Sequence, residues 1–312
     1  MKILFLSRYQ NKNKRGAESF VTELSKKLAK NHQVSIFSES DSDSLSKILQ
    51  GKYDMVIPIN GRLQALKASV GRLMGGYKLL ISGHSGIGRD DIWNIAVVRP
   101  NVFVALTEFQ KEWAKKFSWG TKLTKITDGV DIKKFTPVGE KIELNLEHPI
   151  ILSVGALEWY KYHKRVIEAV SKIADVSLLV VGEGSMKKEL SELGDKLLGK
   201  RFRIKNFDYQ DMPMVYRSCD LFTLPSWERE AFGIVYLEAM ASGLGVVASD
   251  DSPRHEIVGD SGIFVDVTNL QKYATAIEEA LKIDWKSKAK KQAEKFSWDK
   301  IADQYNQILK YL

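Results

Sequence analysis

The sequence lacks paired cysteines and long apolar runs. Its 312 residues include one cysteine, Cys219, which excludes an internal disulfide and fits a reducing compartment. No apolar stretch approaches the roughly 20 residues that a membrane-spanning helix needs. Residues 1–7 become polar too early for a signal peptide. We therefore expect a cytoplasmic protein.

Acidic residues are also scarce in the first half of the chain, relative to basic ones. Residues 1–148 contain 24 Lys and Arg against 15 Asp and Glu, whereas residues 149–312 contain 23 against 24. The formal net charge of +8 therefore comes from the first half. Such an asymmetry is typical of a protein with an anionic partner.

The chain is long enough for two domains, each with its own core. Short apolar runs alternate with amphipathic stretches, a pattern typical of parallel sheets covered by helices. In the first half, strands are predicted at 3–6, 34–37, 55–59, 79–81, 102–106 and 123–126. In the second half they are predicted at 150–154, 176–181, 202–205, 221–224, 245–248 and 263–265. The sequence thus predicts an α/β fold with two doubly wound, Rossmann-like domains and a cleft between them.

Local signals set the predicted boundaries. Residues 135–141 have the Pro, Gly and charge content of a linker, so we predict one domain at 1–140 and a second at 141–296. A final helix over about 298–311, within residues 297–312, carries an apolar face that includes Ile301 and Tyr305. Thr107 and Gln110 predict a capping box at the start of another helix.

The most informative segment is 225–243, which reads PSWEREAFGIVYLEAMASG. A helix is predicted to begin near Phe232. Glu230 lies just before it and Glu238 six residues inside it, which separates the two carboxylates by roughly 9 Å. Unpaired amides at the helix N-terminus, and Gly233, favour an anionic ligand between them. A diphosphate in that position would have one carboxylate at each end.

This segment resembles the donor motif of the retaining glycosyltransferases of family 4, which have the two-domain GT-B fold. The resemblance implies that Glu230 contacts hydroxyls of the donor sugar and that Glu238 holds the ribose hydroxyls. It also places Phe232, Gly233 and Ile234 beside the donor, and implies that the final helix crosses back to the first domain. The competing interpretation is a loop acid followed by a solvated helix acid.

A second element of the resemblance follows residues 150–154. Gly155 and Lys161 stand where the family has Gly-Arg-Leu and then Lys-Gly, and Lys161 matches its phosphate-binding lysine. Ala156 replaces the family's Arg, and a tyrosine replaces the Gly after the lysine. The missing charge would come from Arg165 or His163, or be absent. The alternative for Lys161 is a solvent-facing cation.

Three further positions match the family. Gly16, in KRGAESF at 14–20, matches a glycine loop beside the donor, although a plain helix start is the alternative. His84, just after the strand at 79–81, matches the active-site histidine, with a structural histidine as the alternative. The backbone around Ile204 is expected to hold the nucleotide base. Residues 128–137 also follow a family pattern, with Asp128 in place of Asn, and Gly245 replaces a usual Pro.

Two motifs resemble binding sites of other kinds. The sequence Asp41-Ser42-Asp43 looks like a metal-binding Asp-x-Asp, but its polar surroundings favour a helix cap. Gly182-Glu183-Gly184 looks like a dinucleotide fingerprint without its third glycine, and a tight turn between strand and helix is favoured. We therefore predict no metal ligands.

The resemblance as a whole implies a retaining, metal-independent, hexosyltransferase-type enzyme without a cofactor. Its donor would be a UDP- or GDP-sugar, its acceptor a glycan or a lipid-linked hydroxyl, and nucleic acid no partner. The leaving phosphate oxygen would accept the proton of the incoming hydroxyl on the same face of the sugar. Two alternatives keep the fold. One is a non-catalytic partner subunit that binds nucleotide sugar, and the other is a sugar-nucleotide epimerase or a phosphorylase.

A basic amphipathic helix is predicted within the first domain. It carries Leu63, Leu66, Val70, Leu73 and Met74 together with Arg62, Lys67 and Arg72. Either the apolar residues pack on the sheet, or they face an anionic lipid surface, where each basic residue contributes about 1 kcal/mol. We favour the second, which predicts peripheral association with the inner face of the cell membrane.

Overall fold

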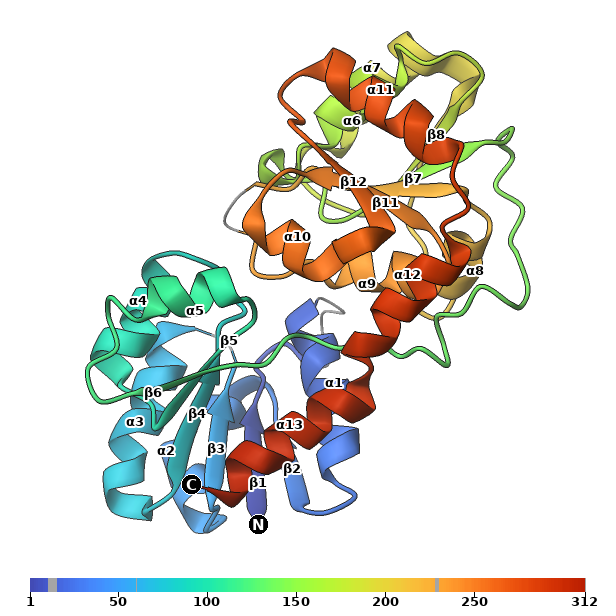
Figure 1. Ribbon diagram of the computed structural model, residues 1–312. Helices are drawn as coiled ribbons and strands as arrows, with labels where there is room; N and C mark the ends of the chain where they lie inside the picture. The colour runs from blue at the N-terminus through green and yellow to red at the C-terminus, as the bar shows by residue number, and fades with distance from the viewer. Residues whose placement is uncertain (11–15, 60, 228–229, 312) are drawn as a thin grey trace. The chain divides into compact units, whose positions relative to one another are not determined.

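The computed structural model describes residues 1–10, 16–59, 61–227 and 230–311. These residues form two compact units (Figure 1). Unit 1 contains residues 1–129, 230–232 and 298–311, and unit 2 contains residues 130–227 and 233–297. The chain passes from one unit to the other at Gly129–Val130, ahead of the linker predicted at 135–141.

Unit 1 is built on a six-stranded parallel sheet in the order β2-β1-β3-β4-β5-β6. Its strands are β1 (Lys2–Leu6), β2 (Gln33–Phe37), β3 (Met55–Pro58), β4 (Lys78–Ser82), β5 (Val102–Ala105) and β6 (Lys122–Lys125). Its helices are α1 (Gly16–Leu28), α2 (Leu45–Gln50), α3 (Arg62–Gly75), α4 (Arg89–Trp93), α5 (Glu108–Ala114) and α13 (Trp298–Lys310). A 3-10 turn, η1 (Glu39–Asp43), and a π-helical turn, η2 (Asn94–Val98), complete it.

Unit 2 repeats this plan with the sheet order β12-β11-β10-β7-β8-β9, again with all strands parallel. Its strands are β7 (Ile150–Val154), β8 (Ser177–Val181), β9 (Phe202–Lys205), β10 (Leu221–Thr223), β11 (Gly245–Ser249) and β12 (Gly262–Val265). Its helices are α6 (His163–Val170), α7 (Lys187–Leu198), α8 (Met212–Arg217), α9 (Ile234–Ala241), α10 (Ser252–Val258), α11 (Leu270–Leu281) and α12 (Lys286–Ala293). Four 3-10 turns are η3 (Trp159–Lys161), η4 (Gly199–Arg201), η5 (Gly259–Ser261) and η6 (Glu294–Phe296).

The predicted fold class is confirmed, and each of the twelve predicted strands is present with ends within one residue of the prediction. The reason is burial on both faces of each sheet. Residues 3–6 of β1 are all fully buried, as alternate side chains of a parallel strand point to opposite covered faces. Such strands read as continuous apolar runs, which are easy to recognise.

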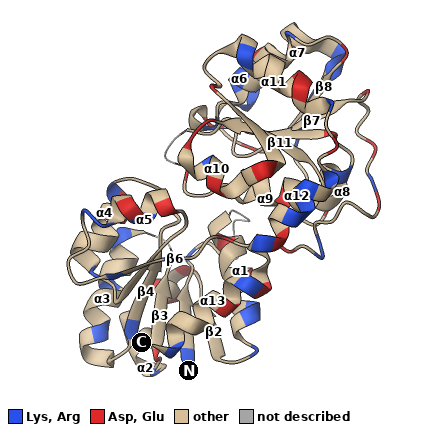
Figure 2. Ribbon diagram, in the orientation of Figure 1, with Lys and Arg blue, Asp and Glu red and all other residues tan. Residues whose placement is uncertain are grey.

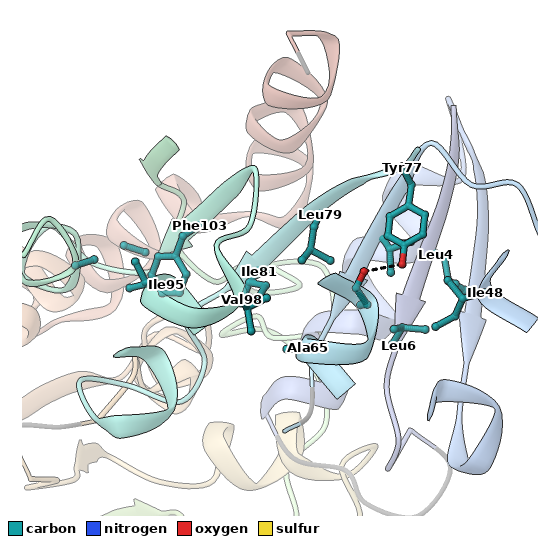
Figure 3. Packing of buried hydrophobic residues seen from close by; sticks show 14 residues of the cluster. Leu4, Leu6, Ile48, Ala65, Tyr77, Leu79, Ile81, Ile95, Val98 and Phe103 are labelled. Carbon is teal, nitrogen blue, oxygen red and sulfur yellow. Dashed lines mark hydrogen bonds between the residues drawn. The ribbon is translucent and has the colours of Figure 1, made fainter. Parts of the chain in front are cut away.

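The core of unit 1 shows how one sheet face is covered (Figure 3). Leu4 and Leu6 of β1 and Leu79 and Ile81 of β4 lie in one buried cluster with residues of α2, α3 and η2. Beside them, the Tyr77 hydroxyl donates a 2.6 Å hydrogen bond to the Ala68 carbonyl of α3. Because the Tyr77 side chain packs against α3, small residues are enough to fill the core on that side of the helix.

The final helix α13 is part of unit 1 and packs against α1. The Phe20 ring of α1 lies 6.1 Å from the Trp298 ring and 6.0 Å from the Tyr305 ring, centroid to centroid. Lys27 also pairs with Asp299 at 2.7 Å. Residues 272 or more positions apart in the sequence thus form one packed layer.

The predicted capping box at Thr107 forms only in part. The Thr107 hydroxyl accepts a 3.1 Å hydrogen bond from the Gln110 amide. The Gln110 side chain does not return to Thr107. Its oxygen accepts a 2.7 Å bond from the Leu106 amide, and its nitrogen donates to the Gly83 carbonyl and to Asp91. Gln110 therefore ties α5 to the loop after β4.

Gly245, where the resembling family has Pro, is explained by a tryptophan. A Cβ at this position of β11 would lie 2.2 Å from Cδ1 of Trp285, and the indole is held by its own 2.8 Å bond to the Ala280 carbonyl. We expect Gly245→Ala to lower the free energy of unfolding by about 1–3 kcal/mol, because the ring has to move. Urea unfolding measures this. Gly155→Ala is the matched control in unit 2, since its Cβ would meet only ordinary contacts of 3.5 Å or more. An equal loss in both variants would contradict the explanation.

Candidate active site

Helix α9 begins at Ile234, two residues after the predicted start. Its N-cap, Gly233, has φ 88° and ψ 64°, a left-handed conformation that favours glycine, and no side chain caps the first turn. The Tyr236 hydroxyl donates to the Leu224 carbonyl, which holds α9 at the end of β10. The main-chain amides of the first turn and the positive end of the helix dipole make this terminus suited to an anion.

Glu238 is a buried acid on α9, not the solvated helix acid of the competing interpretation. Its side chain accepts a 2.9 Å hydrogen bond from the Tyr216 hydroxyl of α8. Burial raises the pKa of Glu238 to about 7, against the opposing effects of hydrogen bonds from Tyr216 and Tyr209 and the charge of Lys134. Each carboxylate oxygen has two acceptor sites, so a held carboxylate can still accept ligand hydroxyls.

The groups around Glu238 were not found in the sequence. Lys134 Nζ donates to the Tyr209 carbonyl at 3.0 Å and lies 3.7 Å from the centroid of the Tyr209 ring. Tyr216 lies in the short helix α8 and carries no motif that would mark it in the sequence. The available signal was chemical, because a buried tyrosine hydroxyl usually has a hydrogen-bond partner. The sequence gives no sign of which partner it is.

The loop after β7 carries Lys161 in turn η3. Tyr162, where the family commonly has Gly, takes a left-handed conformation with φ 53°. The Arg165 guanidinium lies 4.3 Å from the centroid of its ring, and this stacking compensates for part of the backbone cost. The Trp227 amide after β10 donates to the Tyr160 carbonyl at 3.0 Å. The ends of the adjacent strands β7 and β10 are thus tied together around Lys161.

His163 was one candidate for the charge that Ala156 does not provide, and this prediction is wrong at neutral pH. His163 is buried, and its Nδ1 lies 3.1 Å from the Ser153 hydroxyl. Burial, and next to it the charge of Lys161, lower the pKa of His163 to about 4. The ring is therefore neutral, which leaves Arg165 of α6 as the remaining candidate for that charge.

Gly182 and Gly184 allow that loop to pack closely. A Cβ on Gly182 would lie 1.9 Å from the Gly155 carbonyl oxygen, and one on Gly184 would lie 2.4 Å from that of Leu157. The Leu157 amide donates to the Glu183 carbonyl at 2.9 Å. These glycines form the tight turn favoured over a dinucleotide fingerprint, and they support Gly155. On the neighbouring strand β9, Ile204 is half-buried.

In unit 1, His84 follows β4 and Asp128 follows β6, at the same edge of the sheet. His84 Nδ1 lies 3.7 Å from Asp128 Oδ2, and the His84 ring lies 4.3 Å from the Phe20 ring, centroid to centroid. Burial lowers the pKa of His84 to about 4 and raises that of Asp128 to about 7. Among the described residues, His84 Nε2 and Asp128 Oδ1 are buried without a hydrogen-bond partner. His84 is therefore a neutral histidine with one ring nitrogen unused.

The remaining predicted site residues lie in unit 1. Glu230 is half-buried and Phe232 buried in the segment that precedes α9. Gly16 is the first residue of α1, and a Cβ there would meet nothing within 4 Å. The part of the glycine loop at residues 11–15 lies outside the described residues.

The Asp-x-Asp at 41–43 has structural roles in η1. Asp43 pairs with Arg8 at 2.7 Å, Asp41 pairs with Lys47, and the Ser42 hydroxyl accepts a bond from Gln64. Within the described part of the chain, no group of three or more His, Cys, Asp or Glu side chains is arranged to hold a metal ion. Nor does any described helix combine the length and apolar character needed to cross a bilayer.

Comparison with known proteins gives consistent results. Phosphatidyl-myo-inositol mannosyltransferase of Mycolicibacterium smegmatis is 27% identical over 217 residues, which cover 66% of this chain and 56% of the relative. N-acetylgalactosamine-N,N'-diacetylbacillosaminyl-diphospho-undecaprenol 4-alpha-N-acetylgalactosaminyltransferase of Campylobacter jejuni is 34% identical over 188 residues, which cover 56% and 50%. The chain therefore spans about half the length of the curated relatives it matches.

The structure also resembles solved ones. Anabaena Alr3699/HepE, solved in complex with UDP and glucose, matches over 100% of both chains with a TM-score of 0.82 and 18% identity. At that identity the likeness shows a shared fold, the GT-B fold. The family model described as glycosyl transferases group 1 matches residues 137–297, which is slightly more than half of the sequence. The chain therefore belongs to the glycosyl transferases group 1 family.

Proposed function

We propose that the protein is a retaining glycosyltransferase that needs neither metal nor cofactor. It moves a sugar from a nucleoside-diphosphate sugar to an acceptor hydroxyl. The observation that carries the proposal is the buried carboxylate of Glu238 on helix α9, whose N-terminal Gly233 is left-handed and uncapped. One short helix thus offers an anion site at its N-terminus and a carboxylate that can accept hydrogen bonds from hydroxyls. The first suits the diphosphate of a nucleotide sugar and the second suits its ribose.

Donor binding is assigned to unit 2. The Glu238 carboxylate accepts hydrogen bonds from the ribose, and Tyr216 keeps it oriented. The amides that follow Gly233 and the ammonium of Lys161 bind the diphosphate, with Arg165 as a second cation. Lys161 and Gly233 follow the carboxyl ends of β7 and β10, and Arg165 lies in the first turn of α6, at the edge where open α/β sheets bind their ligands.

In the proposed reaction, the bond between the anomeric carbon and the phosphate oxygen breaks. The acceptor oxygen bonds to that carbon on the same face, and the leaving phosphate oxygen takes the acceptor's proton. Lys161 and the N-terminus of α9 stabilise the negative charge that develops on this oxygen. Glu230 and His84 are assigned to the sugar. Because His84 is neutral, it contributes a hydrogen bond and not a charge.

UDP- and GDP-sugars are both candidate donors. For the acceptor we propose a lipid-linked hydroxyl, since the two relatives are named for transfer involving phosphatidyl-myo-inositol and a diphospho-undecaprenol sugar. Such an acceptor would place the protein at a membrane surface. A thermal-shift panel of UDP- and GDP-sugars tests donor binding, because a ligand at about 100 times its dissociation constant adds about 2.7 kcal/mol. Product anomers assigned by NMR test retention, and an inverted anomer would contradict the mechanism.

Nucleotide affinity should depend on pH through Glu238. Burial raises the pKa of Glu238 to about 7, so its carboxylate becomes protonated as the pH falls through that value, whereas an ordinary Glu stays ionised there. The protonated group is a weaker hydrogen-bond acceptor for the ribose hydroxyls. We expect Glu238→Gln to bind the nucleotide more weakly and to lack this pH-dependent part of the affinity. Titration calorimetry with UDP and GDP measures both proteins. The nucleotide's own phosphate titration is common to them, so identical pH profiles would contradict the assignment.

Glu230→Gln should keep the fold and reduce transfer about 10- to 100-fold, because a neutral amide cannot replace a charged hydrogen bond worth roughly 1.5–3 kcal/mol. Initial rates of transfer measure the effect. Glu278→Gln, an exposed change on α11, is the control and should keep the full rate. Near-normal turnover of Glu230→Gln would remove this residue from the site.

Lys161→Ala should lower the rate of the chemical step on the order of 100-fold, because a cation beside the departing phosphate is lost. The matched control is Lys188→Ala on the exposed side of α7, which should change nothing. Single-turnover rates are compared in excess EDTA, where the parent protein should keep its full activity. A requirement for added Mg²⁺ or Mn²⁺ would contradict the metal-independent mechanism.

A further inference from the structure

Helix α3 of unit 1 turns its large apolar residues outward. Leu63, Val70, Leu73 and Met74 are 69%, 49%, 83% and 72% exposed. Positions 63, 70 and 74 recur at helical spacing on one face, and Leu73 flanks them. The alternative in which these four side chains pack on the sheet is therefore wrong, whereas Leu66 is half-buried. A soluble helix normally buries such a face.

The inner side of α3 explains this orientation. Gln64, Ala65, Ala68 and Gly71 are the residues of α3 that are buried against the core. A Cβ on Gly71 would lie 2.5 Å from a side-chain carbon of Leu45 and from the Tyr77 hydroxyl. Only small residues fit at this point, so the helix cannot rotate to bury its leucines.

Charge on α3 is of one sign. Its sequence, RLQALKASVGRLMG, contains three cations and no acid, and Figure 2 shows Lys and Arg without Asp or Glu along this helix. Arg62 pairs with Asp90 of α4 at 2.6 Å. Lys67 and Arg72 donate instead to uncharged groups, the backbone carbonyls of Asp43 and Arg99. Next to α3, η2 adds an exposed apolar residue, Val97, and is tied to the helix by a 2.8 Å bond from Ser69 to the Val98 carbonyl.

We propose that this face, formed by Leu63, Val70, Leu73 and Met74 with Lys67 and Arg72, docks on an anionic lipid bilayer. The apolar side chains enter the acyl boundary while the cations meet lipid phosphates, the arrangement by which amphipathic helices bind an interface. A second copy of the chain is disfavoured as occupant, because two such faces would oppose like charges.

The position of α3 connects this surface with the proposed acceptor. The amino-terminal end of the helix lines a hollow of about 90 Å³ with Ser82, Ser85 and Asn94, at the same sheet edge as His84. Leu63 is the part of the docked face nearest to that edge, so we infer that a lipid-linked hydroxyl would enter there. This part of the inference rests on the proposed function, whereas docking itself does not.

Sedimentation with vesicles tests the docking, using phosphatidylcholine alone or mixed with phosphatidylglycerol. The parent should bind only the mixed vesicles and dissociate in high salt. Leu73→Ser with Met74→Ser should lower the partition coefficient at least about tenfold, the loss of two buried apolar side chains. Lys67→Glu with Arg72→Glu should lower it at least about 25-fold, since each basic residue contributes about fivefold.

Matched controls separate an effect specific to α3 from general effects of positive charge and of exposed apolar surface. Lys290→Glu with Lys291→Glu makes the same charge change on α12, which has no exposed large apolar residue, and Val138→Ser with Ile283→Ser removes exposed apolar residues elsewhere. Both should bind as the parent does. Loss of binding in the controls, or undiminished binding in the α3 variants, would overturn the proposal. Self-association that the α3 variants abolish, without vesicle binding, would instead make this face a protein interface.

The two proposals fail separately. Leu73→Ser with Met74→Ser should keep the parent's melting temperature, because both side chains are exposed. Both α3 variants should keep the parent's nucleotide affinity, because the changed residues lie in unit 1. If vesicles are bound but no sugar is transferred, the enzymatic proposal fails and docking stands. If sugar nucleotides bind and transfer occurs in solution without any vesicle binding, docking fails alone.

Discussion

Burial of both faces of each parallel sheet is the constraint on which the rest of the structure depends. Strands such as β1 and β8 are apolar along nearly their whole length, so beyond their first residue they carry no polar side chains that could bind a ligand or take part in catalysis. Polar function is confined to the strand ends and the helix starts. His84 and Asp128 follow strands of unit 1, and Lys161 and Gly233 follow strands of unit 2. The same constraint explains why the acids and histidines at these ends are partly or wholly desolvated.

Desolvation sets the chemistry of these groups. Glu238, Asp128 and Asp91 have raised pKa values, and His84 and His163 have lowered ones, in each case with burial as the largest cause. The two histidines are neutral, so positive charge at the proposed donor site comes from Lys161 and Arg165. A neutral His84 and a diphosphate held by cations and amides suit a reaction in which the phosphate itself takes the proton.

The fold could be predicted from the sequence because its signals are local. Continuous apolar runs located central strands such as β1 and β8, whereas edge strands such as β6 carry a mixed pattern. Gly233 was recognised as a position where the backbone can approach an anionic ligand closely. The surroundings of Glu238 could not be predicted, because Tyr209, Tyr216 and Lys134 come from three separate segments. The same holds for the approach of Asp128 to His84, which was noted only as a departure from a motif. Pattern reasoning also left open which face of α3 is buried. Packing decided this, since Gly71 admits no larger residue against Leu45 and Tyr77.

The central claim is that a sugar nucleotide binds at the strand ends of unit 2. Hydrogen–deuterium exchange, with and without UDP- and GDP-sugars, tests it most directly because it locates the protected amides. The account predicts slower exchange in residues 155–162 and at the start of α9, around Ile234, and unchanged exchange in α12. Protection confined to other segments, or unchanged exchange at 155–162 and α9 with every sugar nucleotide, would contradict it.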